Sequence, residues 1–246
     1  MRFVSIIFVF LVYRIRCGAF ADELPSFLHV CHRNDPNLIP CLIAAVEEIR
    51  PFLVKGVPEY NLPSLEPLHM KDFFAEETAG MTIKVTEVSA WGCSDYFVRG
   101  IEANMDTNQF VVDVDLPKLR IEAHYHVDGK LLMVQVRGDG DIEANITDVK
   151  ARAELQGELY DKDGEKYMKY TDVKLKVSIG GGSVRLANLF NGDQVLLAMI
   201  NDVVNKNLDL FLKELMPIIQ KSLEGVVMNT GNAITDAFSY KQLFPQ

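Results

Sequence analysis

The stretch QVLLAMINDVVNKNLDLFLKEL, residues 194–215, decides the fold, because its large apolar side chains recur at helical spacing. Asp193 is well suited to cap the N-terminus of this helix. The pattern resumes beyond Pro217, so we expect a helix over residues 194–223, about 45 Å long at 1.5 Å per residue and kinked or broken at the proline. The apolar face that must be covered consists of Leu196, Ile200, Val203, Val204, Leu208, Phe211, Leu212 and Leu215.

Residues 81–190 supply a surface that can cover the helix, because their hydrophobicity alternates with a period of two. In LRIEAHYHV, residues 119–127, apolar residues alternate with charged residues and histidines, and VKARAEL (149–155) and DVKLKVSI (172–179) alternate in the same way. The prediction is an α+β fold in which one long curved antiparallel sheet and one long helix bury each other's apolar faces. Turns are expected at Asp128-Gly129, Gly138-Asp139-Gly140 and Asp161–Gly164, with a turn or bulge at Gly180–Gly182.

The N-terminus has the features of a secretory signal. Arg2 and an apolar run from Phe3 to Tyr13 precede Ala19-Phe20-Ala21, the small-x-small pattern of a cleavage site. We therefore expect a signal peptide over residues 1–21 and a single domain over residues 22–246 of a secreted, extracellular protein. Removing the signal takes away three arginines and no acids, so the net charge goes from −9 to −9 − 3 = −12. Such an acidic chain disfavours nucleic acid as a partner, and the lack of another apolar run of about 18 residues disfavours stable membrane insertion.

Cysteine and histidine are concentrated in HVCHRNDPNLIPC, residues 29–41. In an oxidising compartment, Cys31 and Cys41, ten residues apart, are expected to form a disulfide. The alternative is a zinc site made by His29, Cys31, His32 and Cys41. Because structural zinc ligands are typically two or more residues apart, the adjacent Cys31 and His32 favour the disulfide.

A short helix follows this segment. Asp35-Pro36 predicts its start, with the acid as N-cap and the proline at the first helical position. Apolar residues recur at helical spacing as far as Leu53, and we expect Pro51 and Gly56 to end the element. The disulfide would staple this helix. Cys93 is the remaining cysteine, interpreted as a buried thiol beside Trp91 or as one half of an intermolecular pair.

Catalytic and metal-binding patterns are not supported by the sequence. It contains no G-x-S-x-G, H-E-x-x-H or Walker A motif, so we expect no enzyme, no cofactor and no metal. His124 and His126 share one strand face, but Arg120 and Glu122 on that face indicate a solvated surface. Asp139, Asp141 and Glu143 are interpreted as part of a hairpin turn. Asn145-Ile146-Thr147 is a glycosylation sequon, and its strand pattern directs Asn145 outward.

Several segments together resemble the insect takeout and juvenile-hormone-binding protein family. They are Cys31 with Asp35-Pro36 and Cys41, the run GVPEYNLPSLEPL (56–68), the long late helix and the tail YKQLFPQ (240–246). The resemblance covers nearly the whole mature chain. It implies a sheet rolled around the helix, as in one half of the tubular lipid-binding proteins, with an internal tunnel for a small apolar molecule. The hormone carriers use two disulfides, whereas Cys93 has no partner here, which places the chain nearer the takeout branch and leaves juvenile hormone in doubt as the ligand.

The function expected from this resemblance is reversible sequestration of a small lipophilic ligand, without chemistry. The ligand would be a terpenoid, a juvenile-hormone-like molecule or a fatty lipid, and the Tyr125 hydroxyl is a candidate to orient its polar end. The alternative is a secreted interaction protein whose acidic surface contacts a receptor or partner protein. The residues expected to line the tunnel, for each of which ordinary core packing is the alternative, are Ile121, Tyr125, Met133, Val173, Leu175, Ile200 and Phe211.

Overall fold

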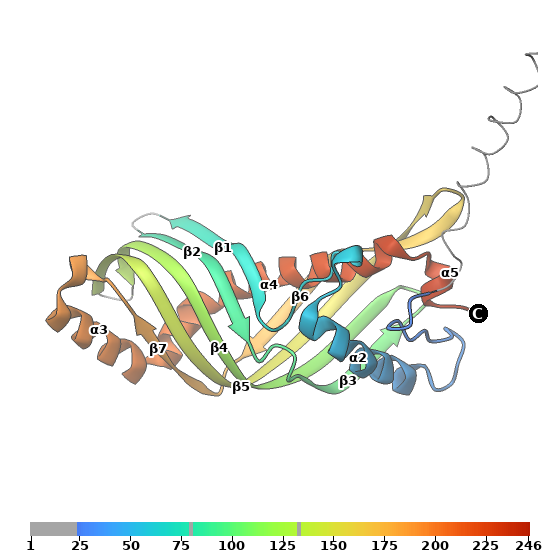
Figure 1. Ribbon diagram of the computed structural model, residues 1–246, viewed down its shortest axis with the longest axis horizontal. Coiled ribbons are helices and arrows are strands. Elements are labelled where there is room, and N and C mark those ends of the chain that lie inside the picture. The colour runs from blue at the N-terminus through green and yellow to red at the C-terminus, as the bar shows by residue number, and fades with distance from the viewer. Residues whose placement is uncertain (1–23, 79–80, 132–133) are drawn as a thin grey trace, which may run out of the picture.

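The computed structural model describes residues 24–78, 81–131 and 134–246, which form an elongated α+β molecule (Figure 1). The expected signal peptide and Met133 lie outside these residues. The helical segments are α2 (Leu38–Lys55), η1 (Pro58–Tyr60), η2 (Phe190–Gly192), α3 (Gln194–Lys206), α4 (Leu208–Ala237) and α5 (Tyr240–Leu243). The strands are β1 (Leu68–Thr78), β2 (Met81–Trp91), β3 (Phe97–Asn104), β4 (Gln109–Leu131), β5 (Val134–Lys162), β6 (Glu165–Ser178) and β7 (Gly181–Leu186).

All seven strands belong to one antiparallel sheet in the order β1-β2-β4-β5-β6, with β3 paired to β4 and β7 paired to β5. β4 and β5, with 23 and 29 residues, form its spine. Strands of that length accumulate a large twist. As a result, α4 contacts β1 at one edge of the sheet and both β6 and β7 at the other. The curled sheet therefore closes around the long helix, as predicted (Figure 1).

The late helical segment is divided at a different place from the one predicted. The break lies at Asn207, between α3 and α4, whereas Pro217 lies inside the unbroken helix α4. The Asn207 side chain donates to the carbonyl oxygen of Val203 at 2.8 Å, and such a local bond competes with the helical ladder. The predicted cap is confirmed, because Asp193 Oδ1 accepts from the backbone N–H groups of Val195 and Leu196, each at 3.0 Å.

Two of the predicted turns are wrong. β4 continues through Asp128 and Gly129, which pair with Arg137 and Val136 of β5. The alternation of inward-facing residues through Tyr125 continues to Val127 and Gly129, both of which are buried. The strand therefore keeps its inward face in the core by continuing past Asp128-Gly129.

Gly138-Asp139-Gly140 is likewise strand rather than turn. A Cβ atom on Gly140 would lie 2.4 Å from the carbonyl oxygen of Ala187, and one on Gly138 would lie 2.7 Å from Leu189 Cδ2. The glycines therefore allow the segment before α3 to pack closely against β5. The remaining two predictions are confirmed, since Asp163-Gly164 joins β5 to β6 and Ile179-Gly180 joins β6 to β7.

The N-terminal helix begins two residues later than predicted and ends at Gly56, as predicted. It begins at Leu38, because the Asp35 carboxylate accepts the backbone N–H of Asn37 at 2.7 Å in a local turn instead of capping a helix at Pro36. Pro51 lies inside α2, and the helix ends at Gly56, whose φ is 74°. The sheet also begins earlier than predicted, at Leu68 in β1.

Candidate ligand-binding interior

Helix α4 is the apolar centre of the curled sheet, but the sheet covers it incompletely. Of its 30 residues, all within the described part of the chain, only Phe211 and Thr235 are fully buried. Its other large apolar side chains are partly exposed, and they include Leu215, Ile218, Ile219, Leu223, Val226 and Val227. A helix used only as a core would have this stripe packed to crystal-like density. The apolar stripe of α4 is therefore only partly covered by the protein's own side chains.

The fully buried residues form separate clusters along the roll. One cluster lies near α3 and contains Tyr125, Val127, Val136 and Leu189. A second, with Ala144, Ile146 and Val149, lies where β5 pairs with β7. A third surrounds Met168 near the C-terminus, and a fourth joins α2 to the loop before β1. A single domain more often has one contiguous core, so the interior is divided along its length.

The described residues among those predicted to line a tunnel are distributed over these parts. Tyr125 is buried in the cluster near α3 with Ile200 packed against it, whereas Ile121 packs against the second cluster. Val173 and Leu175 are buried on β6, and Phe211 is buried on α4. The structure thus brings Tyr125 and Ile200 together and places Ile121 in a different cluster.

The Tyr125 hydroxyl is engaged inside the protein. It donates to the carbonyl oxygen of Ala187 at 2.6 Å, and the residue is only 4% exposed. Burial raises its pKa to about 12, with a smaller contribution from the charges of Asp139 and Asp141. The hydroxyl therefore fastens the chain before α3 to the sheet.

Amide and carboxylate side chains of the two long helices hydrogen-bond the backbone of edge strands, a feature that the sequence analysis missed. Asn205 exchanges two bonds with Val184 of β7, at 2.6 and 2.8 Å, and Asn201 exchanges two with Leu186, at 3.0 and 2.8 Å. On α4, the side-chain oxygens of Gln220, Glu224 and Asn232 accept the backbone N–H groups of Val177, Leu175 and Tyr170.

The spacing of these side chains explains the arrangement. Four helical residues rise about 6 Å and two strand residues about 6.6 Å, so amides at i and i+4 reach successive outward positions of a strand edge. Asn201 with Asn205 and Gln220 with Glu224 have this spacing. We call these hydrogen bonds from helix side chains to the backbone of β6 and β7 the amide seam. Polar residues at i and i+4 beside an apolar helix face are its sequence signal.

Two surface pockets lie beside α4. One, of about 440 Å³, lies between η1 and the C-terminal part of the helix, and its mixed lining includes Glu59, Lys169 and Asp236. The other, of about 350 Å³, lies beside Pro217 and Ile179. Neither is lined by a residue of the predicted tunnel. In the described part of the chain, no helix is both long and apolar enough to cross a membrane.

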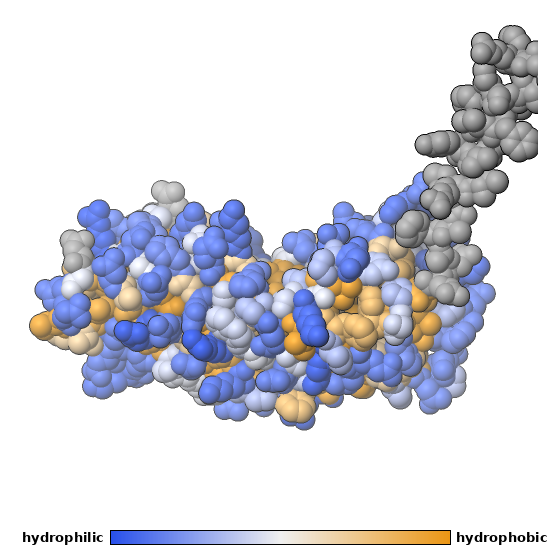
Figure 2. Space-filling view, viewed as in Figure 1, coloured by the Kyte–Doolittle hydropathy of each residue, from blue (hydrophilic) through white to orange (hydrophobic). Residues whose placement is uncertain are grey.

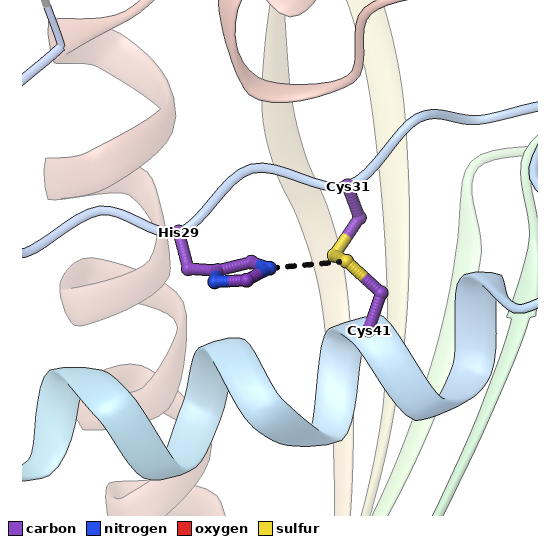
Figure 3. Close-up of side chains that lie close together, drawn as sticks. All are labelled: His29, Cys31 and Cys41. Atoms are coloured by element: carbon purple, nitrogen blue, oxygen red, sulfur yellow. Dashed lines mark hydrogen bonds between the residues drawn. A yellow bond between two sulfur atoms is a disulfide. The ribbon is translucent and has the colours of Figure 1, made fainter.

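The predicted disulfide between Cys31 and Cys41 is present and attaches the N-terminal segment to α2 (Figure 3). His29 Nε2 lies 3.4 Å from Cys41 Sγ, and His29 Nδ1 lies 2.9 Å from Glu48 Oε2. Because both sulfur atoms are in the disulfide, the thiolates that the alternative zinc site requires are not available. Cys93 is free and half-buried.

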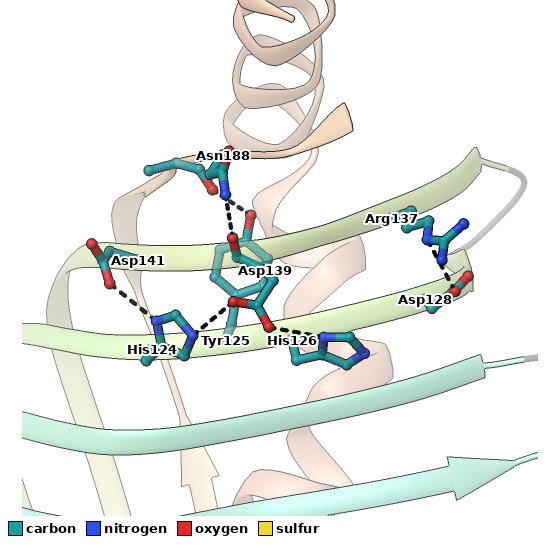
Figure 4. A network of polar contacts seen from close by, with 9 residues as sticks. His124, Tyr125, His126, Asp128, Arg137, Asp139, Asp141 and Asn188 are labelled. Carbon is teal, nitrogen blue, oxygen red and sulfur yellow. Dashed lines mark hydrogen bonds and ion pairs between the residues drawn. The ribbon is translucent and has the colours of Figure 1, made fainter. Parts of the chain in front are cut away.

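The outer face of the sheet is polar along β4 and β5. Asn145 is exposed between the buried residues Ala144 and Ile146, as the strand pattern predicts. His124 and His126 lie on the same face opposite Asp141 and Asp139 of β5 (Figure 4). At the end of the molecule formed by α3, apolar colour interrupts the hydrophilic surface (Figure 2). The exposed apolar side chains of α3 are Val195, Leu196, Met199 and Val203.

A long, partly covered apolar helix held by a curled antiparallel sheet defines the class of this protein by architecture. The chain belongs to the haemolymph juvenile hormone binding protein family, whose family model matches residues 6–245. This membership confirms the resemblance inferred from the sequence, and the family is one of binding proteins.

Individual relatives are distant but span most of the chain. The circadian clock-controlled protein daywake of Drosophila melanogaster is 25% identical over 229 residues, covering 88% of this chain and 87% of that protein. A putative beta-carotene-binding protein of Schistocerca gregaria is 19% identical over 214 residues, covering 86% of each. The crystal structure of Takeout 1 from Epiphyas postvittana superposes with a TM-score of 0.73 at 18% identity, covering 89% of this chain and 100% of that one. This last likeness establishes the fold.

Proposed function

We propose that this protein is a secreted carrier that reversibly binds a small hydrophobic ligand in a tunnel beside α4 and performs no chemistry on it. The observation that carries the proposal is the incomplete burial of the large apolar side chains of α4. An apolar guest would fill that space, and each methylene transferred from water contributes about 0.8 kcal/mol. A guest of about 15 carbons would gain on the order of 10 kcal/mol before the costs of association.

The comparisons support the same class of ligand. The family is named for binding a hormone, and one relative is named as a putative binder of beta-carotene. A terpenoid, a juvenile-hormone-like molecule or a fatty lipid fits an apolar cavity along a helix. Secretion is proposed from the signal pattern of residues 1–21, and glycosylation from the exposed sequon at Asn145.

Organic extraction of the purified protein followed by mass spectrometry tests the proposal. We expect a lipophile in a stoichiometric amount, and displacement of a fluorescent apolar probe such as N-phenyl-1-naphthylamine by that lipophile. If no lipophile is extracted and the probe does not bind, the carrier function is excluded. The alternative, an interaction protein that contacts a receptor through its acidic surface, then becomes the better hypothesis.

A pair of variants on α4 locates the binding space. Val226→Trp places a large ring at a half-buried apolar position, and Lys221→Trp places the same ring at an exposed position of the same helix. We expect Val226→Trp to lower probe binding several-fold while the melting temperatures of both variants stay close to wild type. Equal probe affinity in the two variants would argue against a binding space beside α4.

A further inference from the structure

Two histidines and two aspartates meet on the outer face of β4 and β5, remote from the interior (Figure 4). The register places His124 opposite Asp141 and His126 opposite Asp139. Asp139 bridges the two rings, with Oδ1 3.0 Å from His124 Nε2 and Oδ2 3.0 Å from His126 Nδ1. On its other side, His124 Nδ1 lies 3.2 Å from Asp141 Oδ1. The sequence analysis interpreted these four residues separately, as a solvated face and a hairpin turn.

The bonding of His124 is unusual because both ring nitrogens face carboxylate oxygens. A neutral imidazole donates from only one nitrogen. If Nδ1–H donates to Asp141, the lone pair of Nε2 points at Asp139, and two electron-rich atoms 3.0 Å apart are stable together only with a cation between them. That cation is either a proton or a metal ion.

We propose that His124, His126 and Asp139 bind a divalent first-row transition ion, such as zinc, on this outer face. Two imidazoles and one carboxylate form a ligand set typical of these ions. Asp141 would be a positioning residue, because a carboxylate that accepts the second N–H of a metal-bound histidine fixes its tautomer and orientation.

The distances come close to those of a coordination shell. Ligands at 2.0–2.2 Å from a tetrahedral zinc are separated by about 3.3–3.6 Å. His124 Nε2 lies 3.0 Å from Asp139 Oδ1 and His126 Nδ1 lies 3.0 Å from Oδ2, so each nitrogen is near its own carboxylate oxygen. His124, His126 and Asp139 do not yet form a complete coordination shell. Among the described residues, the only group of three whose ligand atoms all lie within 4.8 Å of one another is His29, Cys31 and Cys41. The His126 ring is about half exposed, with a side-chain exposure of 48%, so it has room to turn toward the ion.

Neighbouring charges favour a cation on balance. Lys84 of β2 lies opposite His126 and opposes binding, while Thr86 opposite His124 is neutral. The opposed pair Glu122 and Glu143 adds negative charge next along the strands. Arg120 contacts Glu122 and Arg185 bonds Glu143, which offsets that charge. Asp139 and Asp141 remain directed at the histidines.

Isothermal titration of the full mature chain with zinc chloride, in a non-chelating buffer and with any affinity tag removed, tests the site. We expect one equivalent to bind with a dissociation constant in the micromolar range. His124→Ala and His126→Ala should each weaken binding at least ten-fold, and Asp141→Asn should weaken it about ten-fold, as loss of an outer-shell partner does. His29→Ala, which alters the other histidine with a carboxylate partner, is the matched control and should leave zinc affinity unchanged.

Cobalt substitution supplies a readout specific to coordination. Co²⁺ should give visible absorption bands with the wild type and the His29→Ala control, and lose them with His124→Ala. The proposal is overturned if zinc binds more weakly than about 1 mM, or if His124→Ala and His126→Ala bind it as the wild type does. Because all four positions are on the outer face, extraction of a lipophile is a separate measurement whose result does not depend on this one.

Discussion

The hydroxyl of Tyr125 donates to the backbone carbonyl of Ala187 at 2.6 Å, which ties strand β4 to the segment that leads into α3. The sequence makes this hydroxyl a candidate to orient a ligand, and the bond to Ala187 also gives it a structural role. Tyr125→Phe should therefore lower the free energy of unfolding by about 1–2 kcal/mol, because it leaves the partly buried carbonyl of Ala187 without its donor.

Urea unfolding measures this loss, and Tyr160→Phe is the control. The Tyr160 hydroxyl bonds Asp236 at an exposed site, where its removal should have little effect. Probe affinity of Tyr125→Phe should match wild type. A large loss of affinity with unchanged stability would mean that the hydroxyl contacts the ligand after all.

Replacing the paired amide side chains of α3 by leucine, which has nearly the same shape, should lower the stability of the protein. Asn201→Leu and Asn205→Leu each remove two bonds to β7 and leave backbone groups of Leu186 or Val184 without partners. We expect a loss of about 1–3 kcal/mol for Asn201→Leu, whose bonds are partly buried. The loss for Asn205→Leu should be smaller, because water can replace its exposed bonds. Asn229→Leu on α4 changes the same chemistry at an exposed position and should be nearly neutral. Thermal unfolding ranks the three, and equal melting temperatures would contradict the seam.

Glu66 predicts a pH-dependent contribution to stability. Burial raises the pKa of its carboxyl, but donation by the backbone N–H groups of Gly92 and Ser94, at 2.9 and 2.8 Å, outweighs this and lowers the pKa below its usual 4.5. Because the pKa is lower in the folded state, this contribution is complete above pH 4.5 and is lost as the pH falls through the folded value.

Glu66→Gln should therefore cost about 1 kcal/mol at neutral pH, and the difference from wild type should shrink below pH 4.5. Denaturant unfolding at a series of pH values measures it. Glu59→Gln, at an exposed carboxylate nearby in sequence, is the control. A difference that persists unchanged at pH 3 would rule out the ionised carboxylate as its source.

Cys93 is predicted to be chemically inert. Burial, together with the charge of Glu66, raises the pKa of its thiol to about 12. Since the thiolate is the reactive form, alkylation by iodoacetamide at pH 8 should be far slower in the folded protein than in urea. Mass spectrometry of the labelled protein measures both rates. Rapid labelling of the folded chain, or an intermolecular disulfide on a non-reducing gel, would contradict this.

Much of the fold was predictable because it rests on hydrophobic periodicity. The alternation through Tyr125 and Val127, and the helical spacing through Phe211, each assign one buried face, and two apolar faces of such length can only cover each other. The disulfide followed from two cysteines in a chain expected to be secreted. These are local signals, and they required no knowledge of which segments meet.

What could not be predicted depends on contacts between distant segments. Gly138 and Gly140 have the composition of a turn, but they are strand residues because Ala187 and Leu189 approach them closely. Similarly, the pairing of His124 with Asp141 depends on the register between β4 and β5. An incorrectly placed turn shifts that register, so the four-residue cluster was not visible in the sequence.

The amide seam has a consequence for how the molecule behaves among other copies of itself. The outer strands of a sheet have unpaired backbone N–H and C=O groups, so another chain can pair with them and cause aggregation. Here the free sides of β6 and β7 are already bonded by side chains projecting from helices, which offer no extended backbone on which a new strand can grow. A shortened chain that ended before α3 would leave both sides open and should form fibres or insoluble material.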